Sequence, residues 1–431
     1  RIIDGITAFA TMNGATRSVV ASAHGSGHGF RMPSVILSWT INGCAMTSCA
    51  VCRVRPAVER CLTSEWRLGR DAGSRRVSPV AAVDGNVAGG TSPTGAVAHG
   101  GRHGAMMPLE ALLDRFMQGD GMRTLICGSF AYDHIMVFGD RFKNHILPDK
   151  VHMLNVSFLV PTMRREFGGC AGNIAYNLKL LGGDPLPMGT VGEDFGPYAA
   201  WMDECGIDRT HVTVVEGTFT GQAFVTTDLD DNQITAFHPG AMGFSHRNEV
   251  GSAAGVGIGI VSPDGREGMI EHARQFAAAG IPFVFDPGQG LPMFDADDLL
   301  RFLDQATWLA ANDYEWELIA ERTGLTIAAA LRQLEAVIVT RGKQGSVIHT
   351  RDESFDIPVV AVDEALDPTG CGDAYRAGLL YGLANGMDWP TTGRIASLLG
   401  AVKIAEDGTQ NHRFSMADFR RRYREEFGGE F

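Results

Sequence analysis

Short apolar segments alternate with amphipathic segments along most of the chain from residue 122 onward. Runs of four to six apolar residues, several ending in Gly, Ser, Asp or Thr, are typical of buried strands, and apolar positions at helical spacing follow most of them. The predicted strands are 124–129, 186–189, 212–215, 257–261, 283–286, 308–311 and 337–340. The predicted helices are 173–181, 197–205, 268–279, 296–305, 314–321, 372–384, 391–405 and 416–427. This pattern predicts an α/β fold with a mostly parallel sheet flanked by helices.

Two regions break the alternation of strands and helices. Residues 135–138 and 155–160 are predicted as strands with no helix between them, and residues 223–227 and 234–237 as a hairpin. These pieces predict a small second sheet, built from about 134–165 and 222–238. It would act as a lid if it covers the carboxyl ends of the parallel strands, where ligands bind in open α/β sheets. A plain extension of the sheet is the alternative.

The first 121 residues do not follow either pattern. Small residues dominate segments such as 21–29 and 85–101, so we expect a low-complexity, disordered N-terminal extension. The chain opens with Arg1, and Met122 directly precedes the first convincing strand, so one hypothesis is that residues 1–121 are absent from the native protein. Three cysteines with C-x4-C-x2-C spacing and a fourth could hold a metal, but chance is favoured because no scaffold surrounds them: Cys44, Cys49, Cys52 and Cys61.

Charge supports a boundary near residue 121. Residues 1–121 contain twelve Arg, eight acidic residues and no Lys, a net charge of +4, whereas the whole chain carries −13 and residues 122–431 therefore −17. Such a balance disfavours a nucleic acid or an acidic membrane surface as partner. No apolar run approaches the roughly 18 residues of a membrane span, and no secretory signal is evident. The scattered cysteines after residue 121 predict free thiols in a reducing cytoplasm.

The segment 367–378, DPTGCGDAYRAG, carries the strongest chemical signal. Its Pro and Gly residues predict a turn, and an apolar helix then begins near Gly372. Free N–H groups at a helix N-terminus suit a phosphate or the charge on a transferred phosphoryl group. Asp373 is positioned to take a proton from an attacking hydroxyl, and the amides of Gly370, Cys371 and Gly372 to stabilise the phosphoryl oxygens. A helix-capping Asp is the alternative.

This segment resembles the C-terminal signature of the ribokinase-like (PfkB) carbohydrate kinases. Residues 167–183, FGGCAGNIAYNLKLLGG, resemble the N-terminal signature, about 200 residues earlier as the family requires. The resemblance implies a ribokinase-like fold and substrate contacts from Gly168, Gly169 and Asn173. It also implies that Asp133 binds two sugar hydroxyls, with Ser129 in the same pocket.

The resemblance extends to the nucleotide site. NDYEWE at 312–317 is similar to the family's N-x-x-E motif, which implies that Asn312 and Glu315 order water and Mg²⁺ around the phosphates of ATP. TRGKQG at 340–345 is similar to the turn under ATP, which assigns Thr340, Gly342 and Gly345. No residue is expected to bind a metal directly. Many members use K⁺ near the anion hole, which makes K⁺ a further expected cofactor.

Within the family, the chain is most similar to bacterial adenosine kinases. The resemblance implies phosphorylation of the adenosine 5′-hydroxyl, with Phe237 stacking on adenine and Gln289 near the substrate. A core Phe is the alternative for Phe237. Cys371 replaces the usual Ala, and a thiol at this place is hypothesised to have a low pKa. Other acceptors, such as inosine or ribose, stay open, as does a non-catalytic ligand sensor. The resemblance also predicts a homodimer through the lid.

Overall fold

The computed structural model describes residues 6–13, 16–23, 37–41, 122–146, 155–230 and 232–431, in two compact units, 1–103 and 104–431. The first unit contains an antiparallel sheet, in the order β1 (Ile6–Asn13), β2 (Thr16–Ala23) and β3 (Leu37–Ile41). The cysteines at 44, 49, 52 and 61 and most of the small-residue segments lie outside the described residues. The interpretation of residues 1–121 as an extension therefore stays a prediction.

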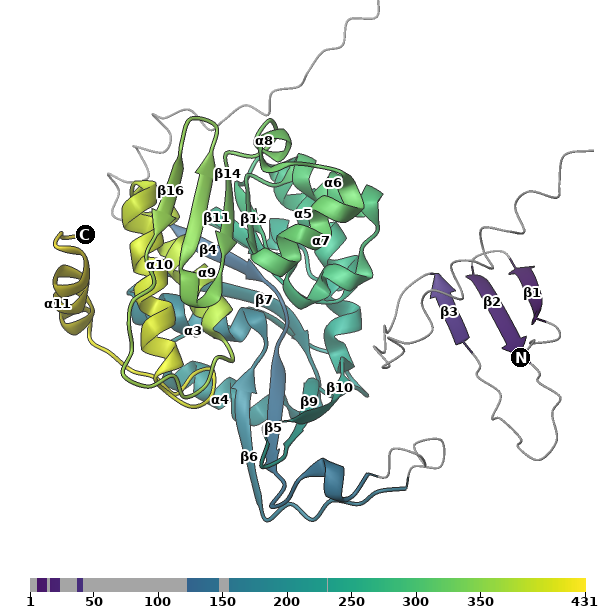
Figure 1. Cartoon of the computed structure of the whole chain (residues 1–431). Helices are drawn as coiled ribbons and strands as arrows, with labels where there is room; N and C mark the ends of the chain where they lie inside the picture. The colour runs from purple at the N-terminus through teal and green to yellow at the C-terminus, as the bar shows by residue number, and fades with distance from the viewer. Residues whose placement is uncertain (1–5, 14–15, 24–36, 42–121, 147–154, 231) are drawn as a thin grey trace, which may run out of the picture. The chain divides into compact units, whose positions relative to one another are not determined.

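The second unit is built on a nine-stranded sheet (Figure 1). In spatial order, the strands are β16 (Ser354–Ile357), β15 (Ser346–Thr350), β14 (Ala336–Thr340), β13 (Trp308–Asn312), β12 (Phe283–Phe285), β11 (Val256–Val261), β4 (Arg123–Cys127), β7 (Pro185–Val191) and β8 (His211–Val214). In this order, the seven strands from β14 to β8 are mutually parallel, whereas β15 and β16 form an antiparallel edge.

Helices cover both faces of this sheet, as the alternation predicted. Successive strand residues point to opposite faces, so Ile126 joins one apolar cluster while Leu125 and Cys127 join the other. One cluster includes residues of α3 (Cys170–Leu180), α4 (Gly196–Glu204), α9 (Cys371–Ala384), α10 (Trp389–Ile404) and α11 (Met416–Phe427). The other includes residues of α5 (Arg266–Ala279), α6 (Ala296–Gln305), α7 (Asp313–Thr323) and α8 (Ile327–Ala330). None of the helices that the structure describes is long and apolar enough to span a membrane.

The predicted second sheet is present, with four strands (Figure 1). Its order is β10 (Gln233–His238), β9 (Gly221–Thr227), β5 (Ala131–Val137) and β6 (Thr162–Gly168). The β9–β10 hairpin is confirmed, with Phe237 opposite Ala223. The nine-stranded, mostly parallel sheet and this small sheet together confirm the predicted α/β architecture.

The predicted strand at 155–160 is wrong, because these residues are irregular and β6 begins at Thr162. Phe158 packs against Phe138 and Phe142, with ring centroids 4.8 and 5.0 Å apart. Phe158 therefore belongs to an aromatic cluster instead of a strand. The β15–β16 edge hairpin was not predicted, since polar residues such as Arg351 and Asp352 interrupt its apolar run.

Candidate active site

The turn before α9 exposes backbone N–H groups at the start of a helix. The Asp367 carboxylate shapes it by accepting hydrogen bonds from the amides of Thr369 (2.9 Å) and Gly408 (3.0 Å). Gly370 caps the helix with a φ of 78°, a conformation that favours glycine. Among the described residues, the amides of Gly370 and Gly372 have no hydrogen-bond partner, whereas the Cys371 amide donates to the carbonyl of Pro368 (3.2 Å). The turn therefore offers N–H donors to an anion.

Asp373 lies in the first turn of α9 and contacts the other signature directly. Its carboxylate accepts a hydrogen bond of 2.8 Å from the side-chain amide of Asn173, on α3. Burial raises the pKa of Asp373 to about 6, with the Asn173 hydrogen bond opposing the rise and the nearby Asp286 adding to it. A carboxylate with a pKa just below neutrality is ionised at pH 7.5 and suited to accept a proton.

A buried polar network fixes the orientation of the Asn173 side chain. The Gln410 amide donates to the Asn173 side-chain oxygen (2.9 Å) and to the Tyr198 hydroxyl (2.7 Å). The Trp201 ring N–H in turn donates to the Gln410 oxygen (2.9 Å), and the Tyr198 hydroxyl to the Gly168 carbonyl (2.9 Å). With its oxygen held by Gln410, Asn173 presents its N–H group to Asp373. No sequence motif pointed to Gln410, which follows α10 outside both signatures.

The paired glycines let the β6–α3 turn pass against the end of β4. Gly169 has a φ of 87°, and a Cβ there would lie 2.6 Å from the Phe130 Cα and from the Ser129 carbonyl oxygen. A Cβ on Gly168 would lie 2.4 Å from a carboxylate oxygen of Asp133. Ser129 is buried, and its hydroxyl accepts a hydrogen bond from the Cys170 amide (3.2 Å). Ser129 therefore supports the start of α3 as well as bordering the predicted pocket.

The four strands of the small sheet bring one row of side chains to a common face. Asp133 on β5 is paired with Glu166 on β6 and with Ala223 on β9, which is opposite Phe237 on β10. Directly paired residues point to the same side of a sheet. Burial raises the pKa of Asp133 to about 6, His134 opposes the rise and Glu166 adds to it.

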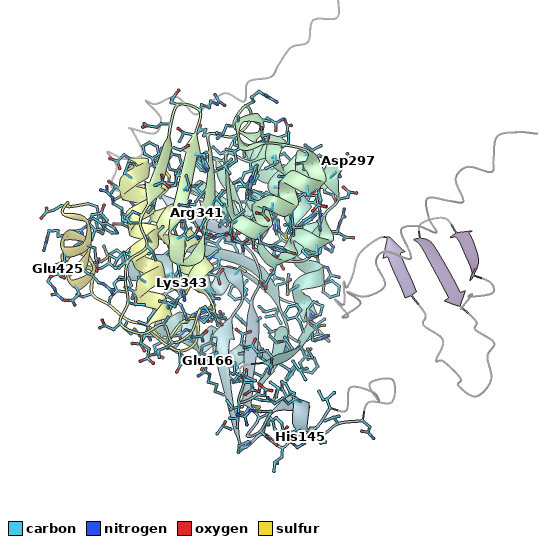
Figure 2. All side chains as sticks on the ribbon, in the orientation of Figure 1. His145, Glu166, Asp297, Arg341, Lys343 and Glu425 are labelled. Carbon is cyan, nitrogen blue, oxygen red and sulfur yellow. The ribbon has the colours of Figure 1, made fainter. Side chains whose placement is uncertain are left out.

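The outer members of this row differ in their surroundings. Glu166, labelled in Figure 2, is on β6. It accepts a hydrogen bond from the Asn411 side chain (2.9 Å), which ties β6 to the segment between α10 and α11. Phe237 is 54% exposed, so it is not a core residue. Gln289 is not on the small sheet; it is exposed on a short 3-10 helix (Gly288–Met293) after β12.

The candidate nucleotide residues lie at the carboxyl ends of neighbouring strands. Asn312 ends β13 and is paired with Thr340, the last residue of β14. Asn312 and Glu315 form a capping box at the start of α7, in which each side chain accepts the other's amide hydrogen (2.7 and 2.8 Å). Burial raises the pKa of Glu315.

The turn between β14 and β15 requires glycine. Gly342 and Gly345 have φ values of 53° and 77°, and a Cβ on Gly345 would lie 2.2 Å from the Ile357 carbonyl oxygen. Figure 2 shows Arg341 and Lys343 on this turn. Arg341 pairs with Asp356 (3.2 Å), so the charge of Lys343 is the one that favours a phosphate-bearing ligand at this turn. Within the part of the chain that the structure describes, no group of three or more His, Cys, Asp or Glu could hold a metal ion.

Arg376, on α9, connects the helix of Asp373 with the strands and helix that carry the candidate nucleotide residues, and no sequence pattern assigned it a role. Its buried guanidinium donates to Asp286 (3.0 Å) and to the Ala310 carbonyl (3.4 Å), and lies 3.9 Å from Glu315. It is three residues after Asp373, so both lie on one face of α9. The three-residue spacing of Asp373 and Arg376 within DPTGCGDAYRAG is the sequence feature that could have identified Arg376. Arg376 neutralises two carboxylates that would otherwise repel the phosphates of a nucleotide.

Comparisons with known proteins agree with this arrangement. The model of the pfkB family of carbohydrate kinases matches residues 132–414. The chain belongs to this family. The kinase is 52% identical to the nucleoside kinase of Burkholderia thailandensis, whose structure was solved in complex with inosine, with a TM-score of 0.66 over 71% of this chain and 99% of that one. It is 32% identical to a nucleoside kinase of Methanothermobacter thermautotrophicus, over 67% of this chain and 91% of that one. For the nucleoside kinase of Methanocaldococcus jannaschii, the structural match has a TM-score of 0.65, 28% identity and coverage of 71% and 100%.

Membership of the family confirms the ribokinase-like fold and makes the kinase a phosphotransferase that uses ATP. One expectation about its anion-binding turn is wrong. The hypothesis of a low-pKa thiol fails because burial raises the pKa of Cys371 to about 11, against the opposing effect of Lys403. The thiol is therefore protonated at neutral pH, and its sulfur lies 3.9 Å from the Asp367 carbonyl oxygen. Cys371 acts at this turn as a small, half-buried side chain.

Proposed function

We propose that this kinase transfers the γ-phosphoryl group of ATP to the 5′-hydroxyl of a purine nucleoside, with adenosine as the first candidate. The observation that carries the proposal is the contact between Asp373 and Asn173, because it joins the two signatures at one point. The candidate base then lies beside a residue expected to bind the sugar. A nucleoside bound to Asn173 would have its 5′-hydroxyl within reach of Asp373 and of the anion-binding turn.

Asp373 accepts the proton of the 5′-hydroxyl as its oxygen attacks the γ-phosphorus. The new O–P bond forms while the bond to the β-phosphate oxygen breaks, so that ADP leaves and Asp373 holds the proton. The free amides of Gly370 and Gly372 stabilise the charge on the transferred group. Cys371 would contribute its amide once the hydrogen bond to Pro368 opens. Mg²⁺, held by the phosphates near Glu315, would neutralise further charge, and the Thr340–Gly345 turn would support the nucleotide.

Sugar recognition falls on Asp133. A carboxylate accepts two hydrogen bonds at once and so selects a vicinal diol, as in ribose. With a pKa of about 6, Asp133 is ionised at pH 7.5. Gly168 is next to it, and any side chain there would fill the space beside the carboxylate.

Base recognition falls on the same face of the small sheet. The exposed ring of Phe237 is available for stacking, and Ala223 leaves room between that ring and Asp133. Stacking tolerates different bases. Inosine is therefore the second candidate, favoured by the inosine complex of the 52% identical Burkholderia enzyme. Gln289 stays a candidate for hydrogen bonding to the base.

The identity of the phosphorylated hydroxyl tests this proposal. Incubation with ATP, Mg²⁺ and either adenosine or inosine should give the 5′-monophosphate, identified by ³¹P NMR and mass spectrometry. 5′-Deoxyadenosine keeps the base and the diol but lacks the attacking hydroxyl, so it should inhibit without being phosphorylated. Phosphorylation of the 2′- or 3′-hydroxyl, or of 5′-deoxyadenosine, would contradict the assigned geometry.

A further inference from the structure

Lys403 is a fully buried cation next to the anion-binding turn. It lies in the last turn of α10 with none of its surface exposed. Its ammonium donates to the carbonyl oxygens of Asp367 (2.6 Å) and Glu406 (3.1 Å), and it forms no ion pair among the described residues. A lysine is almost never fully buried without a charged partner. The C-terminal end of a helix offers partial compensation, because its carbonyl groups carry negative charge.

The ammonium lies at the centre of contacts that fix the turn. The amides of Leu366 and Asp367 donate to the carbonyl of Ile404 (2.8 and 3.3 Å), on the same turn of α10 as Lys403. The Asp367 carboxylate accepts the Gly408 amide (3.0 Å). Gly370 faces Thr409, since a Cβ on Gly370 would lie 3.1 Å from its methyl carbon. The end of α10 and the turn before α9 therefore form one packed unit around the ammonium.

The charge of Lys403 acts on the groups at this turn. It lowers the pKa of Cys371 against the larger effect of burial, and it adds to the hydrogen bonds that hold the pKa of Asp367 low. Asp367, Cys371 and Asp407 favour the charged form of Lys403, whereas burial and Arg164 oppose it, burial most strongly. The positive charge of Lys403 therefore lies at the carbonyl of Asp367, which begins the turn whose N–H groups are assigned to the phosphoryl oxygens.

The family resemblance led us to expect K⁺ near the anion hole. Carbonyl oxygens are suitable ligands for a monovalent cation, but those of Asp367 and Glu406 already receive the Lys403 ammonium. A K⁺ ion beside them would meet a positive charge at close range in a buried site, which is strongly unfavourable. The residues present therefore do not fit K⁺ at this place.

We propose that Lys403 is a built-in cation that positions the anion-binding turn, so that phosphoryl transfer needs no added monovalent ion. This inference rests on the proposed phosphoryl transfer at that turn, but not on which nucleoside is the acceptor. Lys403 does not touch the reacting atoms; it acts through the Asp367 carbonyl and the amides that follow. Loss of its charge should therefore lower kcat and leave the KM for the nucleoside nearly unchanged.

The experiment compares the full-length wild type with the variants Lys403→Met and Lys403→Ala, assayed with K⁺, Na⁺ or tetramethylammonium as the only monovalent cation. Lys179→Ala is the control, because Lys179 also lies in the last turn of a helix, α3, but only half-buried. Wild type and control should keep their kcat within twofold in all three salts. In tetramethylammonium, both Lys403 variants should lose about 10- to 100-fold in kcat with the nucleoside KM within threefold. This is less than the roughly 10²–10³-fold cost of removing a direct donor to a developing anion, because Lys403 acts through the turn. Addition of K⁺ or methylammonium should raise the kcat of Lys403→Ala at least tenfold above its value in tetramethylammonium.

Thermal unfolding provides a second readout that needs no turnover. K⁺ should raise the Tm of Lys403→Ala above its value in tetramethylammonium, and should leave the Tm of the wild type unchanged. A wild type that loses more than tenfold in kcat or several degrees in Tm without K⁺ would overturn the proposal. So would a Lys403→Met enzyme with wild-type kcat, or a kcat loss that no cation restores. Absence of turnover with every nucleoside would instead refute the proposed function, and the Tm comparison would still decide on the cation.

Discussion

Replacement of Asp373 by Asn should make the protein more stable and nearly inactive. The folded-state pKa of about 6 lies above the usual 3.8, so the native state binds this proton more tightly than the unfolded chain. The ionised form is therefore destabilising, fully so above pH 6 and not at all below pH 3.8. A difference of about two pKa units corresponds to about 3 kcal/mol, an upper bound because the side chain is partly exposed.

Denaturant unfolding of wild type and Asp373→Asn at pH 8 and at pH 4.5 measures this effect. The variant should be more stable by about 1–3 kcal/mol at pH 8, and the gain should shrink at pH 4.5, where most of the wild-type carboxyl is protonated. Its kcat should fall about 10²–10⁴-fold, as for loss of a general base, with nucleoside affinity retained. Asp352→Asn, at an exposed position, should change neither property.

Two outcomes would refute this reasoning. A variant that is less stable than wild type by the same amount at both pH values would mean that the charge of Asp373 does not destabilise the folded state. A kcat within tenfold of wild type would mean that another group takes the proton.

Three further predictions follow from the same site. The kcat of the wild type should fall as pH decreases through about 6, because protonated Asp373 cannot accept the hydroxyl proton, and a pH–rate profile that stays flat down to pH 5 would contradict this. Arg376→Met should move that inflection to higher pH, since the Arg376 charge lowers the pKa of Asp373, and should cost about 3–5 kcal/mol of stability because it leaves Asp286 as an unpaired buried charge. Gly169→Ala should destabilise the fold by about 3 kcal/mol or more, because its Cβ would overlap the β4–β5 turn. Gly182→Ala is the control: its φ of 81° is similar but the space around it is open, so it should cost only about 1–2 kcal/mol. Equal losses of stability in the two variants would exclude the overlap.

Local patterns were sufficient to predict most of the fold. The parallel strands and their covering helices follow from short apolar runs and helical spacing, and the observed bounds of most of them differ from prediction by only a few residues. The sequence misled where apolar residues serve another purpose, as at Phe158, which packs in an aromatic cluster. No strand was predicted where few residues are apolar, as in β16.

The candidate site was predictable where one motif holds the relevant residues, as with Asp373 and Asn173. The residues that support them come from distant segments without a motif. Gln410 is 237 positions from Asn173 and Lys403 is 36 from Asp367, so only the folded chain brings them together. The protonation of Cys371 also could not be read from its neighbours in sequence, because burial by the surrounding structure decides it. A homodimer through the small sheet, whose outer strand β10 is exposed along its length, stays a prediction.

The most direct test of the central claim is an ADP-release assay on the full chain, with ATP and Mg²⁺ and with adenosine, inosine, guanosine and ribose offered separately. We expect a kcat/KM for adenosine or inosine far above that for ribose, because the small sheet supplies an aromatic ring for a base in addition to the carboxylate for the sugar. Equal or better turnover of free ribose would show that no base is recognised and would contradict the assignment of a purine nucleoside kinase.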